Sequence, residues 1–407
     1  MGFRETETAT RTAEQAVTNL LLLPLRINQT FGAFPLALDK SKLTLNTSWK
    51  NYTLTFIVST FIILSRFSFY TLSFQDLQTV YRISGSTETF ISNAANNLSS
   101  AFDLICLYTF FKNRYKIQSF YTSYLKHVIR LLSTNYSYCA EEEKILRGET
   151  KKLKIVIGIT IAMLLSVAIN GVTFYCGRAI QSELNIRKVV TFFILTLYWM
   201  TINHIRLLTF YLWIAFIISF KVSFRALGIL MRPRPNESNI CITANRVFWV
   251  LKEYQEIQVY LKEFHALFGA QLVNLCFTAV VPLGNVVFQV VKCFREDGIE
   301  TWELSTLASL VPYILSGMTT FFILCDAATS MTTEATNCMY NLRQIPCISE
   351  MPVDKQQNIL LFYTLTISKP PRISPGSFFY LGRHILSPVL GLITTYMIVI
   401  LQFRSQE

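Results

Sequence analysis

Seven long stretches of this chain are almost free of charge, and each is about as long as a helix that crosses a lipid bilayer. The hydrocarbon core of a bilayer is about 30 Å thick, so a helical crossing needs about 20 mostly apolar residues. The chain has 407 residues, of which 52% are hydrophobic and 15% are charged. Soluble domains carry about 25% charged residues. These features predict an all-α membrane protein with seven transmembrane helices.

The crossings divide the chain into a polar, cytosolic N-terminal arm at residues 1–51 and a seven-helix transmembrane domain at residues 52–403. We expect the crossings near residues 52–72, 89–111, 155–176, 189–220, 268–291, 304–325 and 378–403. Residues 244–265 have amphipathic spacing, which predicts a cytosolic extension that runs into the fifth crossing. The helical pattern of the fourth crossing also continues past the membrane.

Two segments are expected to be irregular. Pro24 falls inside the apolar run 20–38 and is expected to break it into an interfacial or re-entrant piece. Residues 326–377 contain several prolines and are expected to form a polar connector before the last crossing.

The positive charges predict the orientation in the membrane. Of the 37 lysines and arginines, 26 fall within residues 1–51, 112–152, 221–266 and 326–377, and 7 fall on the other side of the crossings. Cytosolic loops carry an excess of such residues. The N-terminus is therefore expected in the cytosol and the C-terminus outside.

The sequence lacks the patterns of common catalytic and metal sites. The nine cysteines include no Cys-x-x-Cys pair, and the four histidines are scattered. There is no His-Glu-x-x-His, no Gly-x-Ser-x-Gly and no phosphate-binding Walker loop. We expect no enzymatic activity, no metal and no cofactor, and the charge distribution fits membrane topology better than nucleic-acid binding.

The last apolar stretch, residues 385–403, carries an amide near its end. Gln402 would lack a hydrogen-bond partner if it faced lipid, so it should face protein or water. Residues three or four apart share a helix face. On that face lie Val399, Thr395 or Tyr396, and Leu392. This pattern leaves two roles open: a pore wall with Val399 as an apolar gate, or a polar contact with a neighbouring helix.

The same stretch resembles the closing signature of the insect gustatory receptors. The matching residues are Thr395-Tyr396, followed by five residues and Gln402-Phe403, with Gly376-Ser377-Phe378-Phe379 as the lead-in and Phe31-Gly32-Ala33-Phe34-Pro35 before the first crossing. The resemblance implies a seven-helix cation channel of the insect gustatory and odorant receptor superfamily. It implies a homo- or heterotetramer in which the last helices meet at a central pore, gated by a small-molecule tastant and held together by the cytosolic ends of helices four to seven. The residues of that pore would be Leu392, Thr395, Tyr396, Val399, Gln402 and Phe403.

The resemblance also indicates which class of tastant the protein would bind and in which cell membrane it would lie. Sugar-receptor relatives tend to carry glutamate after the Thr-Tyr pair, where this chain has Met397. This favours a bitter or other non-sugar tastant, with a fructose-type receptor as the alternative within the family. The resemblance implies the plasma membrane of a gustatory neuron as the location.

Polar and aromatic residues in the outer halves of the crossings could line a ligand pocket, since such pockets combine aromatic walls with a few fixed polar groups. The candidates are Asn93, Asn97, Asn170, Thr173, Thr196, Trp199, Asn285, Gln289, Trp302 and Tyr313. Each of them also fits ordinary helix packing or an interfacial aromatic belt. Two other classes of function remain open: a G-protein-coupled type of seven-helix receptor and a membrane transporter.

Overall fold

The structure is a computed structural model of the 407-residue chain. It describes residues 2–30, 35–39, 44–70, 104–105, 107–133, 136–181, 186–232, 240–295, 301–345 and 352–404.

The described chain is almost entirely helical. Its helices are α1 (Gly2–Thr30), α2 (Trp49–Tyr70), α5 (Arg114–Ser133), α6 (Tyr136–Gln181), α7 (Ile186–Leu230), α8 (Ile240–Arg295), α9 (Thr301–Arg343), α10 (Val353–Ser368) and α11 (Leu386–Arg404). Two short 3-10 turns, Pro375–Ser377 and Arg383–Ile385, lie between α10 and α11. Strands β1 (Leu36–Asp39) and β2 (Thr44–Thr47) pair as an antiparallel hairpin in which Leu36 lies opposite Thr47.

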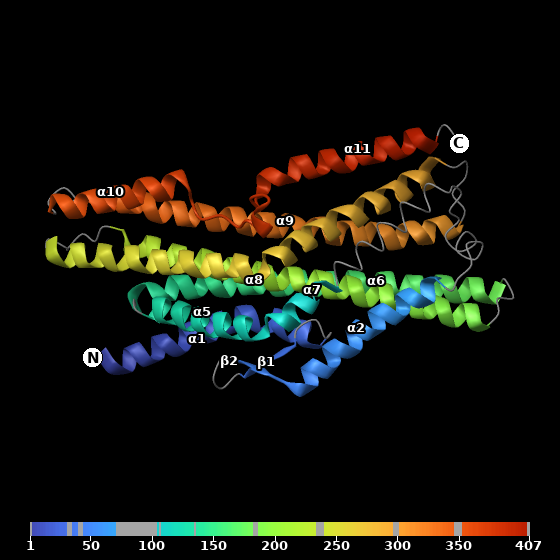
Figure 1. Ribbon diagram of the computed structural model, residues 1–407, viewed down its shortest axis with the longest axis horizontal. Helices are drawn as coiled ribbons and strands as arrows, with labels where there is room; N and C mark the ends of the chain where they lie inside the picture. Colours follow the sequence, from blue (N-terminus) through green and yellow to red (C-terminus); the bar gives the residue numbers. More distant parts are fainter. Residues whose placement is uncertain are drawn as a thin grey trace.

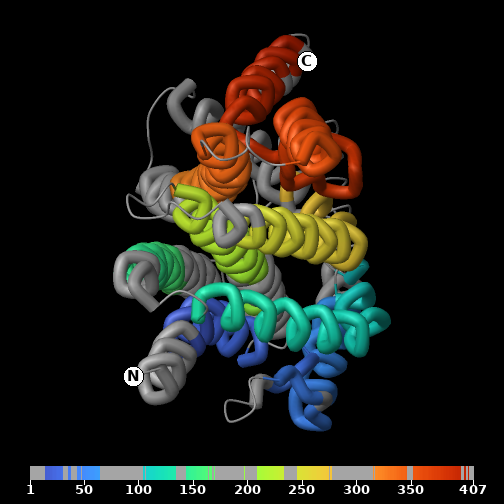
Figure 2. Tube along the Cα trace, turned by 90° about the vertical axis from the view of Figure 1, so that its left-hand side faces the viewer, coloured from blue at the N-terminus to red at the C-terminus, as the bar shows by residue number. Residues whose placement is uncertain are grey.

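The long helices α6, α7, α8 and α9 run along the length of the molecule (Figure 1). At one end lie the start of α8, the end of α9 and helix α10, whereas α11 runs along the outside toward the other end (Figure 1). Viewed along this axis, α11 forms one edge, and α1, α2 and the hairpin lie toward the opposite edge (Figure 2). The two termini therefore lie at opposite ends of the molecule.

Helix α7 is the centre of the described core. From Thr209 to Met231 almost every side chain is buried, with Lys221 and Arg225 in between as partly buried exceptions. A helix that is apolar around its whole circumference must be covered on all sides. Helix α7 accordingly packs against α1, α5, α6, α8 and α9.

Helix α1 runs through Pro24 without a break, so the expected interruption there is wrong. Proline inside a helix costs about 3 kcal/mol. Burial of a leucine side chain contributes about 1.5–3 kcal/mol, and Leu20, Leu21 and Leu25 are all fully buried. Packing of this apolar face therefore outweighs the local cost of proline. Helix α1 belongs to the bundle and packs against α5, α6 and α7.

The helices are longer than the expected crossings. Residues 240–295 form one helix, which confirms that residues 244–265 extend the fifth helix. The expected connector at 326–377 is instead largely helical, because α9 continues to Arg343 and α10 follows. The last helix begins at Leu386 rather than near residue 378.

One described helical stretch, Thr209–Leu230, is long and apolar enough to cross a membrane by length and composition, and 89% of it is buried inside the chain. Only residues with described side chains enter this finding. Apart from this stretch, which overlaps the fourth expected crossing, the expected crossings remain predictions from the sequence.

Candidate functional site: the last helix and its linker

Most of the described surface of α11 is uncovered within the chain. Leu392 is 62% exposed and Val399 is 40% exposed, whereas Ile393 is buried. Gln402 is also exposed. The predicted stripe is therefore available to a partner, to lipid or to water.

The hydroxyl of Thr395 donates to the backbone carbonyl of Gly391 at 2.9 Å within the same helix. This bond satisfies the hydroxyl without a neighbouring helix, so an interhelical role for Thr395 gains no support from the chain. Tyr396 and Phe403 lie on α11, but their side chains are outside the described part.

The candidate ligand-pocket residues are not tested by the described side chains. Asn93 and Asn97 lie outside the described residues. The other eight lie on the four long helices, and their side chains are outside the described part: Asn170 and Thr173 on α6, Thr196 and Trp199 on α7, Asn285 and Gln289 on α8, Trp302 and Tyr313 on α9.

The linker between α10 and α11 is fastened to the two long helices beside it. The hydroxyl of Thr332 on α9 donates to the carbonyl of Pro371 at 3.1 Å. The backbone N–H of Ser374 donates to Nε2 of His265 on α8 at 3.2 Å. Burial lowers the pKa of His265 to about 4, so the ring is neutral at physiological pH and its Nε2 can accept this bond.

The end of the linker is held by an ion pair. Arg383 pairs with Asp326 of α9, with Nε donating to Oδ1 at 2.7 Å, and its backbone N–H donates to Oγ1 of Thr329 at 2.9 Å. The sequence pattern placed Arg383 within the last crossing. The structure places it before the helix, where its charge is neutralised by a partner.

A backbone contact brings the linker against α8. A Cβ atom built on Gly269 of α8 would lie 3.0 Å from the backbone N of Gly376. Gly376 itself has a φ of +53°, and a Cβ there would lie 2.9 Å from side-chain atoms of Val273 and Phe378. Glycine tolerates positive φ and allows such close approach because it lacks a Cβ. The linker therefore packs directly on α8 at Gly269, one helical turn beyond its hydrogen bond with His265.

Inside the bundle, hydroxyl groups join three of the long helices. The phenol of Tyr211 on α7 bonds to the hydroxyl of Thr160 on α6 and lies 3.2 Å from that of Thr320 on α9. All three side chains are buried. Buried polar groups need such partners, and the sequence gives no signal of this contact because it does not show which helices are neighbours.

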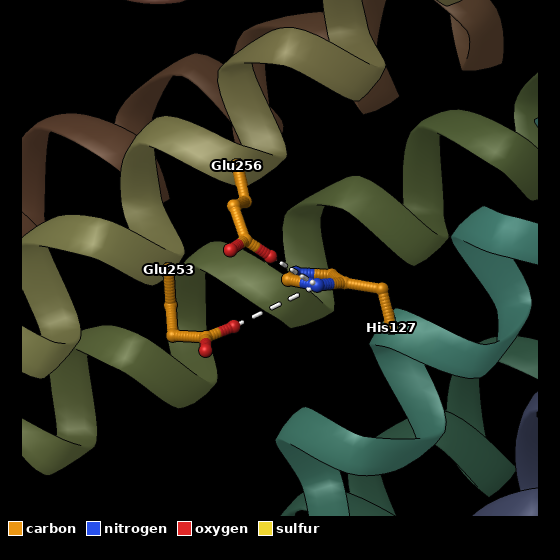
Figure 3. Close-up of side chains that lie close together, drawn as sticks. All are labelled: His127, Glu253 and Glu256. Carbon is orange, nitrogen blue, oxygen red and sulfur yellow. Dashed lines mark ion pairs between the residues drawn. The ribbon is translucent and has the colours of Figure 1, made fainter.

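A second polar cluster links α5 to α8 (Figure 3). Nδ1 of His127 lies 3.2 Å from Oε2 of Glu256 and 3.6 Å from Oε2 of Glu253. His127 and Glu253 are almost fully buried, whereas Glu256 is 37% exposed. The spacing of three residues within each pair, His127 with Arg130 and Glu253 with Glu256, was visible in the sequence, but the pairing of the two helices was not.

The same cluster has the ligand types of a metal site, but a guanidinium nitrogen occupies the centre. Nη2 of Arg130 lies 3.0 Å from Oε2 of Glu253, 3.2 Å from Oε2 of Glu256 and 3.2 Å from Nδ1 of His127. A metal ion bound to those three atoms would need the same position. We therefore interpret the cluster as an ionic link between α5 and α8.

The cluster predicts a pH dependence of stability. Burial lowers the pKa of His127 below its ordinary value of 6.5, and the charge of Arg130 lowers it further. The unfolded chain then binds a proton that the folded chain rejects, so stability is lost as pH falls through 6.5, at most about 1.4 kcal/mol per pH unit. Between pH 7.5 and 5.5, His127→Gln should lose less thermal stability than the parent, measured as Tm. The control is His384→Gln, at an exposed histidine, which should follow the parent; equal pH dependence of all three proteins would contradict the prediction.

Comparison with known proteins identifies the class. The sequence matches the 7tm Chemosensory receptor family over residues 21–407. The fold is similar to the insect olfactory receptor OR5 from Machilis hrabei in complex with eugenol, with a TM-score of 0.65, 12% identity, and coverage of 98% of this chain and 100% of that chain. A second structure of that receptor gives a TM-score of 0.62 and 13% identity over 93% of this chain and 96% of that chain. No curated protein sequence matches the chain.

The family match and the similar fold identify this chain, whose described part is almost wholly helical, as a chemosensory receptor of the membrane. The chain belongs to the 7tm chemosensory receptor family. The resemblance to the insect gustatory and odorant receptor superfamily is thereby confirmed.

Proposed function

We propose that this protein is a gustatory receptor that acts as a tastant-gated, non-selective cation channel for a bitter or other non-sugar compound. The observation that carries the proposal is the uncovered last helix, whose exposed face holds Leu392, Val399 and Gln402. A polar and apolar stripe of this kind suits a pore wall shared between subunits. The similar olfactory receptor binds eugenol, which supports a small-molecule ligand here.

The proposed assembly is a homo- or heterotetramer. It is supported by α10, which presents Val353, Leu360, Leu361 and Leu365 at exposures of 57–68%. In the proposed topology these four side chains lie in the cytosol, where several exposed apolar side chains on one helix mark an interaction site. A second receptor subunit would cover it, and the pore helices would then meet around a common axis.

The channel proposal is tested by current from purified receptor in planar bilayers, with a panel of bitter, sugar and other tastants. We expect at least one non-sugar compound to evoke a cation current without any G-protein. Responses in cells that vanish when G-proteins are removed would instead identify a G-protein-coupled receptor. Substrate flux at fixed stoichiometry without current would identify a transporter. A response to fructose alone would retain the channel and overturn the non-sugar assignment.

The proposed topology is tested by glycosylation. Asn46 and Asn51 each begin an Asn-x-Ser/Thr acceptor pattern. Both lie in the N-terminal arm, which the proposal places in the cytosol, so neither should carry glycan in the expressed receptor. Nδ2 of Asn51 also donates to the carbonyl of Leu36 at 3.1 Å, which holds its amide against the hairpin. Glycosidase treatment followed by mass spectrometry provides the measurement, and a glycan on exposed Asn46 would place the arm outside the cell.

A further inference from the structure

Three aromatic rings surround a cation where α2 and α5 begin. The guanidinium carbon of Arg114, the first residue of α5, lies 5.4 Å from the ring centroid of Tyr52 on α2. It also lies 5.5 Å from the ring centroid of Phe111 and 4.4 Å from that of Tyr115. The rings of Tyr52 and Phe111 are 4.4 Å apart and so join the two segments. We call these four residues the Arg114 cluster.

The Arg114 cluster lies where the chain changes direction along the molecule. From it, α2 runs toward the end where the C-terminus lies, whereas α5 runs toward the end where α10 lies (Figure 1). The proposed topology places α2 in the membrane and α10 in the cytosol. The sequence independently predicts the cytosolic ends of the first two crossings at residues 52 and 111, which both belong to the cluster. The cluster is therefore expected at the cytosolic surface of the membrane.

The exposed side chains of α2 change in character at the level of the cluster. Trp49, the first residue of α2, is 86% exposed, and Phe56, seven residues later on the same face, is 69% exposed. Further along the helix, Ile57 and Leu64 are 55% and 59% exposed. Tryptophan is enriched where a bilayer meets water, and aliphatic residues face the acyl chains. The order of these residues fits a helix that enters the membrane at Trp49.

The surroundings of the cluster are positively charged after the carboxylates of the same segments and of the facing helices are counted. Residues 39–57 and 103–118 together contain six lysines and arginines and two aspartates. The stretch of α8 that faces α5, residues 260–268, adds one lysine and one glutamate, whose charges cancel. The other two glutamates of α8 are paired with Arg130, and α7 contains no acidic residue.

Arg114 has hydrogen-bonding capacity for an external anion. A guanidinium carries five N–H donors. Nη1 donates to the backbone carbonyl of Phe111 at 3.0 Å, and Nη2 lies 3.5 Å from the hydroxyl of Tyr115. Among the described residues, the groups that contact this guanidinium are neutral. A guanidinium that stacks on aromatic rings and has donors to spare is well suited to bind a phosphate.

We propose that the Arg114 cluster binds the phosphate of an anionic phospholipid in the cytosolic leaflet, whose acyl chains lie along the exposed apolar face of α2. That leaflet is negatively charged and attracts basic residues near its surface. Exposed Lys112, whose Nζ lies 5.9 Å from the ring centroid of Tyr108, supplies a second cation beside the cluster. The choice of leaflet rests on the proposed topology, whereas the contact with phospholipid does not.

The binding experiment uses the full-length purified receptor in detergent at physiological salt. Dioctanoyl phosphatidylserine is the anionic probe, and dioctanoyl phosphatidylcholine, which has no net charge, is the comparison. A basic residue near an anionic surface contributes about fivefold in affinity. We expect Arg114→Gln to weaken binding of phosphatidylserine about fivefold, and Lys112→Gln combined with Arg114→Gln to weaken it at least about tenfold.

The matched control is Lys126→Gln, which removes an exposed charge from α5 roughly three helical turns beyond the cluster. It should bind phosphatidylserine like the parent. Arg114→Lys keeps the charge but loses the planar guanidinium, so its affinity should be intermediate. Equal loss in Lys126→Gln and Arg114→Gln, or equal affinity of the parent for the two lipids, would overturn the proposal.

Glycerophosphoserine, which is the same headgroup without acyl chains, distinguishes a lipid from a soluble phosphate compound. We expect it to bind more weakly than phosphatidylserine because it cannot contact the apolar face of α2. Binding as tight as that of the lipid would identify a soluble ligand and overturn the lipid assignment.

The depth of the cluster is measured by fluorescence quenching in vesicles that contain phosphatidylserine, which needs no change at Arg114. Trp49 is one of five tryptophans, so its contribution is the difference between the parent and Trp49→Phe. Lipids brominated near the headgroup should quench this contribution more than lipids brominated near the end of the acyl chain. Equal quenching by both, or quenching by neither, would overturn the interfacial location. These measurements need no current, so a failed channel experiment leaves them unchanged, and their failure leaves the channel proposal standing.

Discussion

Val399→Ser should raise the current through the receptor in the absence of any tastant. Val399 is 40% exposed on α11, and in the proposed tetramer four copies form an apolar ring. A narrow apolar ring excludes water and so stops ions without any charge. Serine hydroxyls would hydrate it. A change of about 1.4 kcal/mol in the balance between closed and open states raises a small open population about tenfold.

Gln402 lies three residues beyond Val399 and is also exposed. Gln402→Glu should shift the relative permeability among cations, because a carboxylate ring attracts cations more strongly than an amide ring. The tastant concentration for half-maximal response should change little. Whole-cell recordings with exchanged external cations measure both quantities.

The control for these pore variants is Ile398→Leu, an exposed position on α11 outside the predicted stripe. It should conduct like the parent. If variants at Val399 and Gln402 reach the cell surface and also conduct like the parent, this face of α11 does not line the pore. Its residues would then serve contacts between helices.

The second large effect concerns assembly. The double variant Leu361→Glu and Leu365→Glu should convert the purified receptor to monomers and abolish its current. Both leucines are at least 57% exposed in the single chain, so the change leaves the core of the subunit intact. Between subunits, however, each replacement forfeits about 1.5–3 kcal/mol of apolar burial and places a charge in an apolar contact.

Native mass spectrometry or light scattering after size exclusion measures the number of subunits. The conservative variant Leu361→Met and Leu365→Met keeps the apolar face and should remain tetrameric. A tetramer that survives both glutamates would show that α10 does not lie between subunits. The ion pair of Arg383 with Asp326, which is outside this surface, should persist in every case.

Apolar runs predicted the positions of the long helices α6, α7, α8 and α9, because the length and hydropathy of each run can be read from the local sequence. The extension at residues 244–265 was visible for the same reason. Helix α10 was missed because the surrounding prolines and polar residues suggested a connector. Its leucines Leu360, Leu361 and Leu365 are exposed in the described part of the chain, so they do not belong to the core that apolar runs usually indicate. Pro24 led to the wrong prediction of a break in α1. Burial of the apolar face of α1 outweighs the free-energy cost of a proline inside the helix.

The candidate site was predictable only in part. The stripe on α11 follows from helical spacing alone, and its described members Leu392, Val399 and Gln402 are exposed. The linker contacts were not predictable, because His265 and Ser374 are far apart in the sequence and only the fold brings them together. The Tyr211 hydroxyl network and the Arg114 cluster depend likewise on which helices are neighbours.

The linker contacts α8 near the middle of that helix, so this contact could serve as a pivot about which α8 tilts. Helix α8 has 56 residues, so at 1.5 Å per residue it is about 84 Å long. Gly269, where the linker touches it, lies close to the middle. If the helix tilts as a rigid rod about this point, its two ends swing by similar amounts in opposite directions. A small displacement at the proposed ligand pocket would then be reproduced, with its sign reversed, at the far end of α8 beside α10 (Figure 1).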